Sequence, residues 1–160
     1  MQFPAKVSRQ SSRRKLVLCI DDDKKVLHAR KLVLETAGYN VITASSGGHG
    51  LRLLERHPVQ LVILDYRMPE MNGEAVTREI RRTHPHVPIL MLSGQIDVPK
   101  RASSAVDAFV AKGQPHAVLL GHLTALAEGG PRKHPSSTSS GRASNRKEVK
   151  SSHEGESEMV

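Results

Sequence analysis

The chain is poor in cysteine and in aromatic residues, and it has no long apolar segment. Its one cysteine, Cys19, excludes an intrachain disulfide and agrees with a reducing compartment. No apolar stretch approaches the roughly 18 residues that a membrane-spanning helix needs. The basic N-terminus precedes an apolar segment, Leu16–Ile20, that is too short for a signal peptide and runs directly into aspartates. These absences predict a cytoplasmic protein without a membrane span.

Positive charge is concentrated near the N-terminus. The net charge is +8, and residues 1–14 hold four basic side chains and no acidic one. Such an arm could contact nucleic acid or acidic lipid. Phe3 is its only aromatic residue, however, so it offers little for base stacking. We interpret residues 1–14 as a basic, flexible, solubilising arm and keep nucleic-acid binding through the arm and the tail as the alternative.

The composition changes abruptly after Glu128. Residues 129–160 begin with Gly-Gly-Pro, are dominated by serine, glycine and charged residues, and contain no aromatic residue. A segment with so little to bury cannot offset the entropy of ordering its backbone. We therefore expect one folded domain over residues 15–128 and a disordered, low-complexity tail over residues 129–160.

Five short apolar runs recur along the predicted domain. These runs are Leu16–Ile20, Tyr39–Ala44, Leu61–Leu64, Ile89–Leu92 and Ala108–Ala111. Each is continuous rather than alternating, which is typical of strands buried on both faces of a sheet. Because the stretches between them have helical character, right-handed crossovers should join parallel strands. The pattern predicts an α/β fold in which a doubly wound, five-stranded parallel sheet is the middle one of three layers.

Apolar residues at helical spacing mark the stretches between the strands. The first helix, which Asp22 or Asp23 can cap and Gly38 can end, is marked by the helical spacing of Val26, Ala29, Val33 and Ala37. A second helix is expected around Leu51 and Leu54, with Ser46 and Gly47 at its start, and a third contains Ala75, Val76 and Ile80. The last helix should begin at Pro115, and one of its faces comprises Val118, Leu119, His122, Leu123 and Leu126. Between Ser93 and Asp107 the sequence favours only a short or frayed fourth helix.

Polar side chains follow the predicted strands at their carboxyl ends. Asp21 and Asp22 follow the first strand, Asp65 the third, Ser93 the fourth and Lys112 the fifth. In a doubly wound parallel sheet, ligands bind beyond this edge. Carboxylates gathered there repel one another, and a hard divalent cation held by oxygens offsets that cost. With a nucleophilic carboxylate, a hydroxyl and an ammonium, the set suits Mg²⁺-dependent phosphoryl transfer.

Other residues that could extend this site have simpler interpretations. Asp23 is expected to cap the first helix rather than to bind a metal. The run Gly47-Gly48-His49-Gly50 could cradle a phosphate, but no Gly-Lys-Ser/Thr follows it, which favours the start of a helix. The nine histidines show no zinc-ligand spacing.

Four segments, each at the end of a predicted strand, resemble the receiver domain of two-component response regulators. They are Ile20-Asp21-Asp22, Leu64-Asp65-Tyr66-Arg67-Met68-Pro69 with Met71, Asn72 and Gly73 behind it, Met91-Leu92-Ser93-Gly94, and Phe109-Val110-Ala111-Lys112. The resemblance covers residues 15–127 and implies a flavodoxin-like domain with strand order 2-1-3-4-5. The chain departs from the family at Gly113, where a proline is usual, and at Ser93, where threonine is commoner.

The resemblance implies a role for each matching acidic position. Asp65 would accept a phosphoryl group from a histidine kinase or a phosphotransfer protein. Asp22 would bind Mg²⁺ directly and Asp21 through water. Asp65 itself and the backbone carbonyl of Arg67 would complete the protein ligands of the metal.

The resemblance also implies how phosphorylation is sensed. Ser93 would move to hydrogen-bond the phosphoryl group, and Lys112 would pair with it. Phe109, which is also expected to fill the core, would be the switch residue that swings inward. A phosphoryl group adds about −1.5 to −2 charges, which biases an existing conformational equilibrium.

We therefore expect a stand-alone signalling receiver that is not an enzyme beyond Mg²⁺-dependent self-phosphorylation and autodephosphorylation at Asp65. Its phosphorylation would change the binding of an unidentified downstream protein. An aspartate-nucleophile hydrolase is a further alternative, but such enzymes need a second carboxylate close after the nucleophile. Here Tyr66 and Arg67 follow Asp65, which argues against hydrolysis of small phosphoesters.

Overall fold

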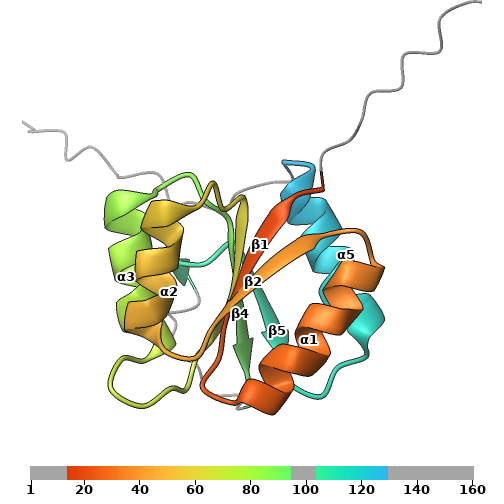
Figure 1. Cartoon of the computed structure of the whole chain (residues 1–160), viewed down its shortest axis with the longest axis horizontal. Helices are drawn as coiled ribbons and strands as arrows, with labels where there is room; N and C mark the ends of the chain where they lie inside the picture. The colour runs from red at the N-terminus through yellow and green to blue at the C-terminus, as the bar shows by residue number, and fades with distance from the viewer. Residues whose placement is uncertain (1–13, 95–103, 130–160) are drawn as a thin grey trace, which may run out of the picture.

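The computed structural model describes residues 14–94 and 104–129, which fold around a parallel sheet of five strands (Figure 1). The strands are β1 (Leu16–Ile20), β2 (Asn40–Ala44), β3 (Leu61–Asp65), β4 (Ile89–Ser93) and β5 (Ala108–Ala111). Their order in the sheet is β2-β1-β3-β4-β5. The predicted fold class and strand order are confirmed, and each strand begins and ends within one residue of its predicted run.

Helices cover both faces of the sheet. The helices of the described residues are α1 (Lys24–Thr36), α2 (Gly47–Arg56), α3 (Gly73–Thr83) and α5 (His116–Ala127). In Figure 1, α2 and α3 lie on one side of the sheet, and α1 and α5 lie on the other. The three predicted layers are therefore present.

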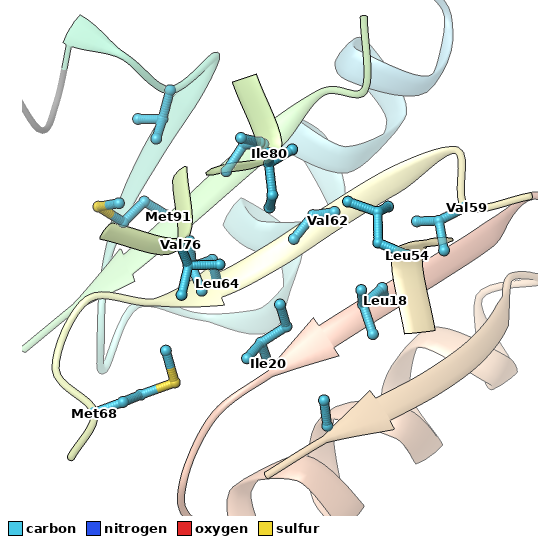
Figure 2. Close-up of a cluster of buried hydrophobic side chains, with 13 residues drawn as sticks. Leu18, Ile20, Leu54, Val59, Val62, Leu64, Met68, Val76, Ile80 and Met91 are labelled. Atoms are coloured by element: carbon cyan, nitrogen blue, oxygen red, sulfur yellow. The ribbon is translucent and has the colours of Figure 1, made fainter. Parts of the chain in front are cut away.

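The sheet separates two apolar clusters. In the first, Val62 and Leu64 of β3 pack with Val76 and Ile80 of α3 (Figure 2). Ile63, between them in the sequence, belongs to the second cluster, which lies on the side of α1 and α5. Because both faces of the sheet are covered, every residue of β3 and β4 is buried. This burial explains why the strands read as continuous apolar runs.

The buried face of α1 is not the stripe of apolar residues that marks this helix in the sequence. Leu27 and Leu34, seven positions apart, are buried and pack in the second cluster. Of the four residues whose spacing predicted the helix, Val26, Ala29 and Val33 lie in the wall of a cavity beside α5, and Ala37 is the exposed C-cap. Two apolar stripes run along this helix, and periodicity alone does not decide which of them faces the sheet.

The prediction for α5 is partly right. Leu119 and Leu123 are buried in the second cluster, and Leu126 packs against it. Val118, however, is 38% exposed, and His122 is exposed as well. The face that this helix buries is therefore narrower than predicted.

The glycine-rich run is the first turn of α2, as the helix-start interpretation predicts. Ser46 is the N-cap of this helix, and its hydroxyl accepts a hydrogen bond from the backbone N–H of His49. A Cβ at Gly50 would lie only 2.4 Å from the Cδ1 of Ile20. Glycine therefore lets α2 lie close against β1.

A buried ion pair ties α3 to the amino edge of the sheet. Arg81 Nη2 lies 2.6 Å from Asp107 Oδ2, and the two side chains are 17% and 2% exposed. The same oxygen accepts the backbone N–H of Ile89 at 2.7 Å. Arg81 also donates to the carbonyls of Ala105 and Val87, at 3.0 and 2.8 Å. These hydrogen bonds, which were not predicted from the sequence, offset the desolvation of both charges.

Parts of the prediction lie outside the described residues. The expected arm over residues 1–14 and tail over residues 129–160 fall almost wholly outside, as does most of the expected fourth helix, which would include residues 95–103. In the described ranges no helix is both long enough and apolar enough to cross a membrane.

Candidate functional site

Three carboxylates meet at the carboxyl edge of the sheet. Asp21 and Asp22 follow β1, and Asp65 is the last residue of β3. These strands are neighbours, and Ile20 pairs with Leu64 across them, which brings Asp21 and Asp65 side by side. One oxygen from each of the three carboxylates lies within 4.8 Å of the other two. Asp21 and Asp65 are 1% and 2% exposed, whereas Asp22 is exposed.

This donor set fits a small, hard cation. Carboxylate oxygens that lie this close can bind one ion, and Mg²⁺ prefers such oxygens while keeping some of its waters. Within the described part of the chain, Asp65 Oδ1 has the ammonium of Lys112 as its partner, 2.9 Å away. The exposed Asp22 leaves the site open to solvent.

Asp23 does not join the acidic group as a further ligand. Its side chain is the N-cap of α1 and accepts hydrogen bonds from the backbone N–H groups of Lys25 and Val26, at 2.8 and 3.2 Å. Its own backbone N–H donates to Asp21 Oδ1 at 3.0 Å. The predicted capping role is confirmed, and the start of α1 helps to orient Asp21.

Lys112 supplies the cation at this edge of the sheet. It follows β5 directly, and its backbone N–H donates to the carbonyl of Ser93 at 2.7 Å. The ammonium Nζ lies 2.9 Å from Asp65 Oδ1 and 3.7 Å from Asp21 Oδ2. Gly113 follows with a φ of 90°, a backbone conformation that favours glycine. The lysine therefore contacts both buried carboxylates.

The buried surroundings perturb Asp65. Burial raises the pKa of this carboxyl above its ordinary value of 3.8, and the charge of Asp21 acts in the same direction. The ammonium of Lys112 and a hydrogen bond from the backbone N–H of Arg67 lower the pKa without cancelling the effect of burial. An ionised Asp65 is thus stabilised less than it would be in water, and a cation beside it would relieve that cost. The carbonyl of Arg67, the fourth predicted metal ligand, lies two residues after Asp65, in the loop between β3 and α3.

Ser93 and Phe109 occupy different surroundings. Ser93 is the last residue of β4, is 1% exposed, and pairs with Ala111 in β5. Phe109 lies in the middle region of β5 and is half-buried against the cluster under α2 and α3. Ser93 thus lies at the edge where the carboxylates meet, whereas Phe109 packs against the first cluster.

The loop between β3 and α3 wraps closely around Asp65. The backbone N–H of Gly73 donates to the carbonyl of Tyr66 at 2.9 Å, and a Cβ at Gly73 would lie 2.7 Å from the carbonyl oxygen of Asp65. Glu70 has a φ of 65°, which side-chain-bearing residues rarely adopt. Met68 is buried. The start of α3 is therefore held against the backbone that carries Asp65.

Arg30 is a residue of this site that was not predicted from the sequence. Both terminal nitrogens of this arginine lie 3.3 Å from Asp21 Oδ2. The signal that could have found it is its place on α1, between Ala29 and Val33 on an apolar stripe. A charged residue in an otherwise apolar stripe needs a buried partner, and an acidic strand end lies just ahead of this helix.

The receiver domain family of response regulators matches residues 17–123, so the chain belongs to this family. This finding confirms the family that the four strand-end segments predicted. It agrees with the sheet order and with the gathering of acidic residues at the carboxyl ends of β1 and β3.

Curated relatives resemble the chain over its receiver region. The transcriptional regulatory protein GlrR of Escherichia coli is 42% identical over 83 residues, which are 52% of this chain and 19% of GlrR. The transcriptional regulatory protein AfsQ1 of Streptomyces coelicolor is 36% identical over 128 residues, which are 78% of this chain and 56% of AfsQ1. The chain therefore covers less than two thirds of the length of either relative.

Solved structures resemble the described fold. The response regulator protein TrrA of Thermotoga maritima, solved in complex with Mg²⁺ and BeF, aligns with a TM-score of 0.67 and 29% identity over 70% of this chain and 98% of TrrA. A CheY-like receiver domain protein of Methanospirillum hungatei aligns with a TM-score of 0.69 and 27% identity, over 72% of this chain and 95% of that protein.

Proposed function

We propose that Asp65 accepts a phosphoryl group from a histidine kinase or a phosphotransfer protein in a Mg²⁺-dependent reaction, and that this event switches the binding of a downstream protein. The observation that carries the proposal is the position of Asp65. Its carboxylate is buried at the end of β3, within 4.8 Å of two further carboxylates and 2.9 Å from a lysine. Membership of the receiver family supports the same function.

The metal would be held by Asp22 directly, by Asp21 through water, and by Asp65 and the backbone carbonyl of Arg67. When bound, Mg²⁺ would neutralise charge on the transferring phosphoryl oxygens. The related TrrA was solved with Mg²⁺ and BeF, which supports a metal in a fold of this kind. The oxygens of Asp21, Asp22 and Asp65 have the chemistry and the mutual proximity that a shared Mg²⁺ needs.

The side chains of the site would divide the chemistry among them. An oxygen of Asp65 attacks phosphorus, the P–N bond of the donor histidine breaks, and its electron pair stays on the imidazole nitrogen. Lys112, already 2.9 Å from Asp65, pairs with the incoming phosphoryl oxygens. The hydroxyl of Ser93 donates to the same group, and Phe109 passes the change to the first cluster. Chemistry beyond self-phosphorylation and autodephosphorylation of Asp65 is not expected.

Labelling with a small phosphodonor tests the assignment. Incubation with Mg²⁺ and acetyl phosphate should add one phosphoryl group to the wild type, as intact-mass spectrometry would show, and none to Asp65→Asn. The matched control is Asp23→Asn, which removes a neighbouring negative charge and keeps a good N-cap residue. This variant should be labelled like the wild type, and EDTA should prevent labelling of both. Labelling of Asp65→Asn would refute the site.

Nucleic-acid binding is a second candidate function, which the similarity to transcriptional regulatory proteins favours. GlrR and AfsQ1 are transcriptional regulatory proteins, and in this chain nucleic-acid binding would depend on the basic residues of the arm and the tail. A gel-shift assay should then show binding that weakens steeply with salt and that is lost when residues 1–14 are deleted. Absence of binding at low salt would exclude this alternative.

A further inference from the structure

Arg30 places a buried positive charge on one of the three carboxylates. It lies on α1, and its two terminal nitrogens are each 3.3 Å from Asp21 Oδ2. The arginine side chain is 9% exposed and the aspartate side chain 1%. Arg30 also lines a cavity of about 470 Å³ whose walls include the apolar side chains of Val33 and Leu119. Because both side chains are this far buried, the ion pair is screened less by solvent than a surface pair would be.

Asp21 is therefore neutralised before any metal binds. Its Oδ2 faces two cations, because Lys112 Nζ lies 3.7 Å from the oxygen that Arg30 contacts. Its Oδ1 accepts the backbone N–H of Asp23 at 3.0 Å. Both carboxylate oxygens of Asp21 thus have donors, whereas Asp22 is exposed to solvent and Asp65 Oδ1 is paired with Lys112.

The charge balance shows what this arrangement does to metal binding. Asp21, Asp22 and Asp65 face Arg30 and Lys112, which leaves a net charge of −1 at the site. Without Arg30 the net charge of the site would be −2. The site would then attract a divalent cation more strongly, because the positive guanidinium that repels the cation is gone. Removal of the arginine would also leave Lys112 as the one remaining cation of the described pairs to offset the repulsion among the carboxylates of the metal-free protein.

We infer that Arg30 is a built-in counter-ion that competes with Mg²⁺ for Asp21, which weakens metal binding and stabilises the metal-free domain. The inference rests on the proposed function, since it takes the three carboxylates to be a Mg²⁺ site. Arg30 is a positioning residue in this scheme, because it acts through Asp21. Its effect has an uncommon sign: loss of a buried ion pair should improve ligand binding.

Calorimetric titration of the full chain with Mg²⁺ at low ionic strength tests the inference. Arg30→Gln should lower the Kd for Mg²⁺ about tenfold, because a full positive charge leaves the neighbourhood of the divalent ion. Arg30→Lys keeps the charge and should stay within about threefold of the wild type. Lys31→Gln is the matched control: it removes the same charge from the next position of α1, where Lys31 pairs with Glu35 instead. Its Kd should equal that of the wild type.

Thermal unfolding gives a second readout. In EDTA, Arg30→Gln should melt below the wild type, and saturating Mg²⁺ should raise its melting temperature more than that of the wild type. If Arg30→Gln fails to fold, Arg30→Met replaces it in the titration, because its side chain keeps an apolar stem in the cavity wall. The Kd of this variant for Mg²⁺ should fall by the same factor.

The possible failures are distinguishable. A wild type that binds no Mg²⁺ would overturn the proposed function and this inference with it. A wild type that binds Mg²⁺, together with an uncharged Arg30 variant whose Kd is unchanged or higher, would overturn the inference alone. That second result is also what a merely structural role of Arg30 would produce, because loosening the site weakens metal binding.

Discussion

Lys112 Nζ lies 2.9 Å from Asp65 Oδ1, although the strands that carry the two residues are separated by β4. The contact is possible because β5 ends one residue before Lys112 and parallel strands end at the same edge. The backbone N–H of Lys112 is held by the carbonyl of Ser93 at 2.7 Å, so the end of β4 positions the lysine. Lys112 thus joins the carboxyl ends of β3, β4 and β5, through its ammonium to Asp65 and its backbone N–H to Ser93.

Replacing the lysine should separate metal binding from phosphoryl transfer. In Lys112→Gln we expect the rate of Asp65 phosphorylation by acetyl phosphate to fall at least about tenfold, because one charge-assisted contact to the phosphoryl oxygens is lost. Binding of Mg²⁺ should persist, since no metal ligand is removed. Time-resolved mass spectrometry and calorimetry measure the two quantities. A variant that is labelled as fast as the wild type would contradict the role of Lys112.

The raised pKa of Asp65 predicts a pH-dependent gain in stability for Asp65→Asn without metal. Because the folded-state pKa exceeds the ordinary 3.8, ionisation of Asp65 disfavours the folded state. That penalty is absent below the ordinary value and is complete once the pH exceeds the folded-state pKa. In EDTA the variant should therefore melt above the wild type at pH 7, and the gain should vanish as the pH falls below about 4.

Excess Mg²⁺ is the control for this experiment. A metal ion at the site stabilises the ionised carboxylate of the wild type, so the advantage of Asp65→Asn should shrink or reverse. A variant that is no more stable than the wild type at pH 7 in EDTA would show that Lys112 and the Arg67 N–H outweigh burial at this carboxyl.

Two glycine substitutions should have opposite effects on stability. A Cβ at Gly73 would lie 2.7 Å from the carbonyl oxygen of Asp65 and 2.8 Å from the Cα of Tyr66, both backbone atoms that cannot rotate away. Gly73→Ala should therefore lower the free energy of unfolding by about 2 kcal/mol and disturb phosphorylation at Asp65.

Gly121 lies in the middle of α5, is exposed to solvent, and has no atom within 4 Å of such a Cβ. Gly121→Ala should stabilise by about 0.5 to 1 kcal/mol. Urea denaturation measures both, and a neutral Gly73→Ala would contradict the close packing.

The Arg81–Asp107 pair should matter for stability and not for the site. Asp107→Ala leaves the guanidinium of Arg81 without its carboxylate and removes the acceptor of the Ile89 N–H, so we expect a loss of about 3 kcal/mol. The control is Glu79→Gln, whose partner Arg82 is 71% exposed, and the expected loss is below about 0.5 kcal/mol. The Kd for Mg²⁺ should stay unchanged in both variants. A loss for Asp107→Ala no greater than for Glu79→Gln would refute the buried pair as a stabilising contact.

The fold could be predicted because its signals are local. Strands buried on both faces need continuous apolar runs, and those runs are visible one by one, as Leu16–Ile20 and Ala108–Ala111 show. The residues that follow a strand lie at its carboxyl end whatever the rest of the chain does. For that reason Asp65 and Lys112 could be placed at one edge before any distance was known.

Three features escaped prediction because they depend on how distant segments pack. The choice between the two apolar stripes of α1 is made by the neighbouring sheet, which buries Leu27. The pairing of Arg30 with Asp21 needs the direction of one long side chain across the start of that helix. The pairing of Arg81 with Asp107 joins α3 to the residue that precedes β5, beside the first residue of β4.

The order of residues along the chain thus decided the elements, the edge at which polar groups collect, and the membership of the receiver family. Packing in three dimensions decided which charges are buried and which of them touch. The physical reason is the distance along the chain over which each effect acts. Backbone preference and apolar patterning act over a few neighbouring positions. An ion pair such as Arg30 with Asp21 depends instead on the burial and placement of two side chains, which only the folded domain supplies.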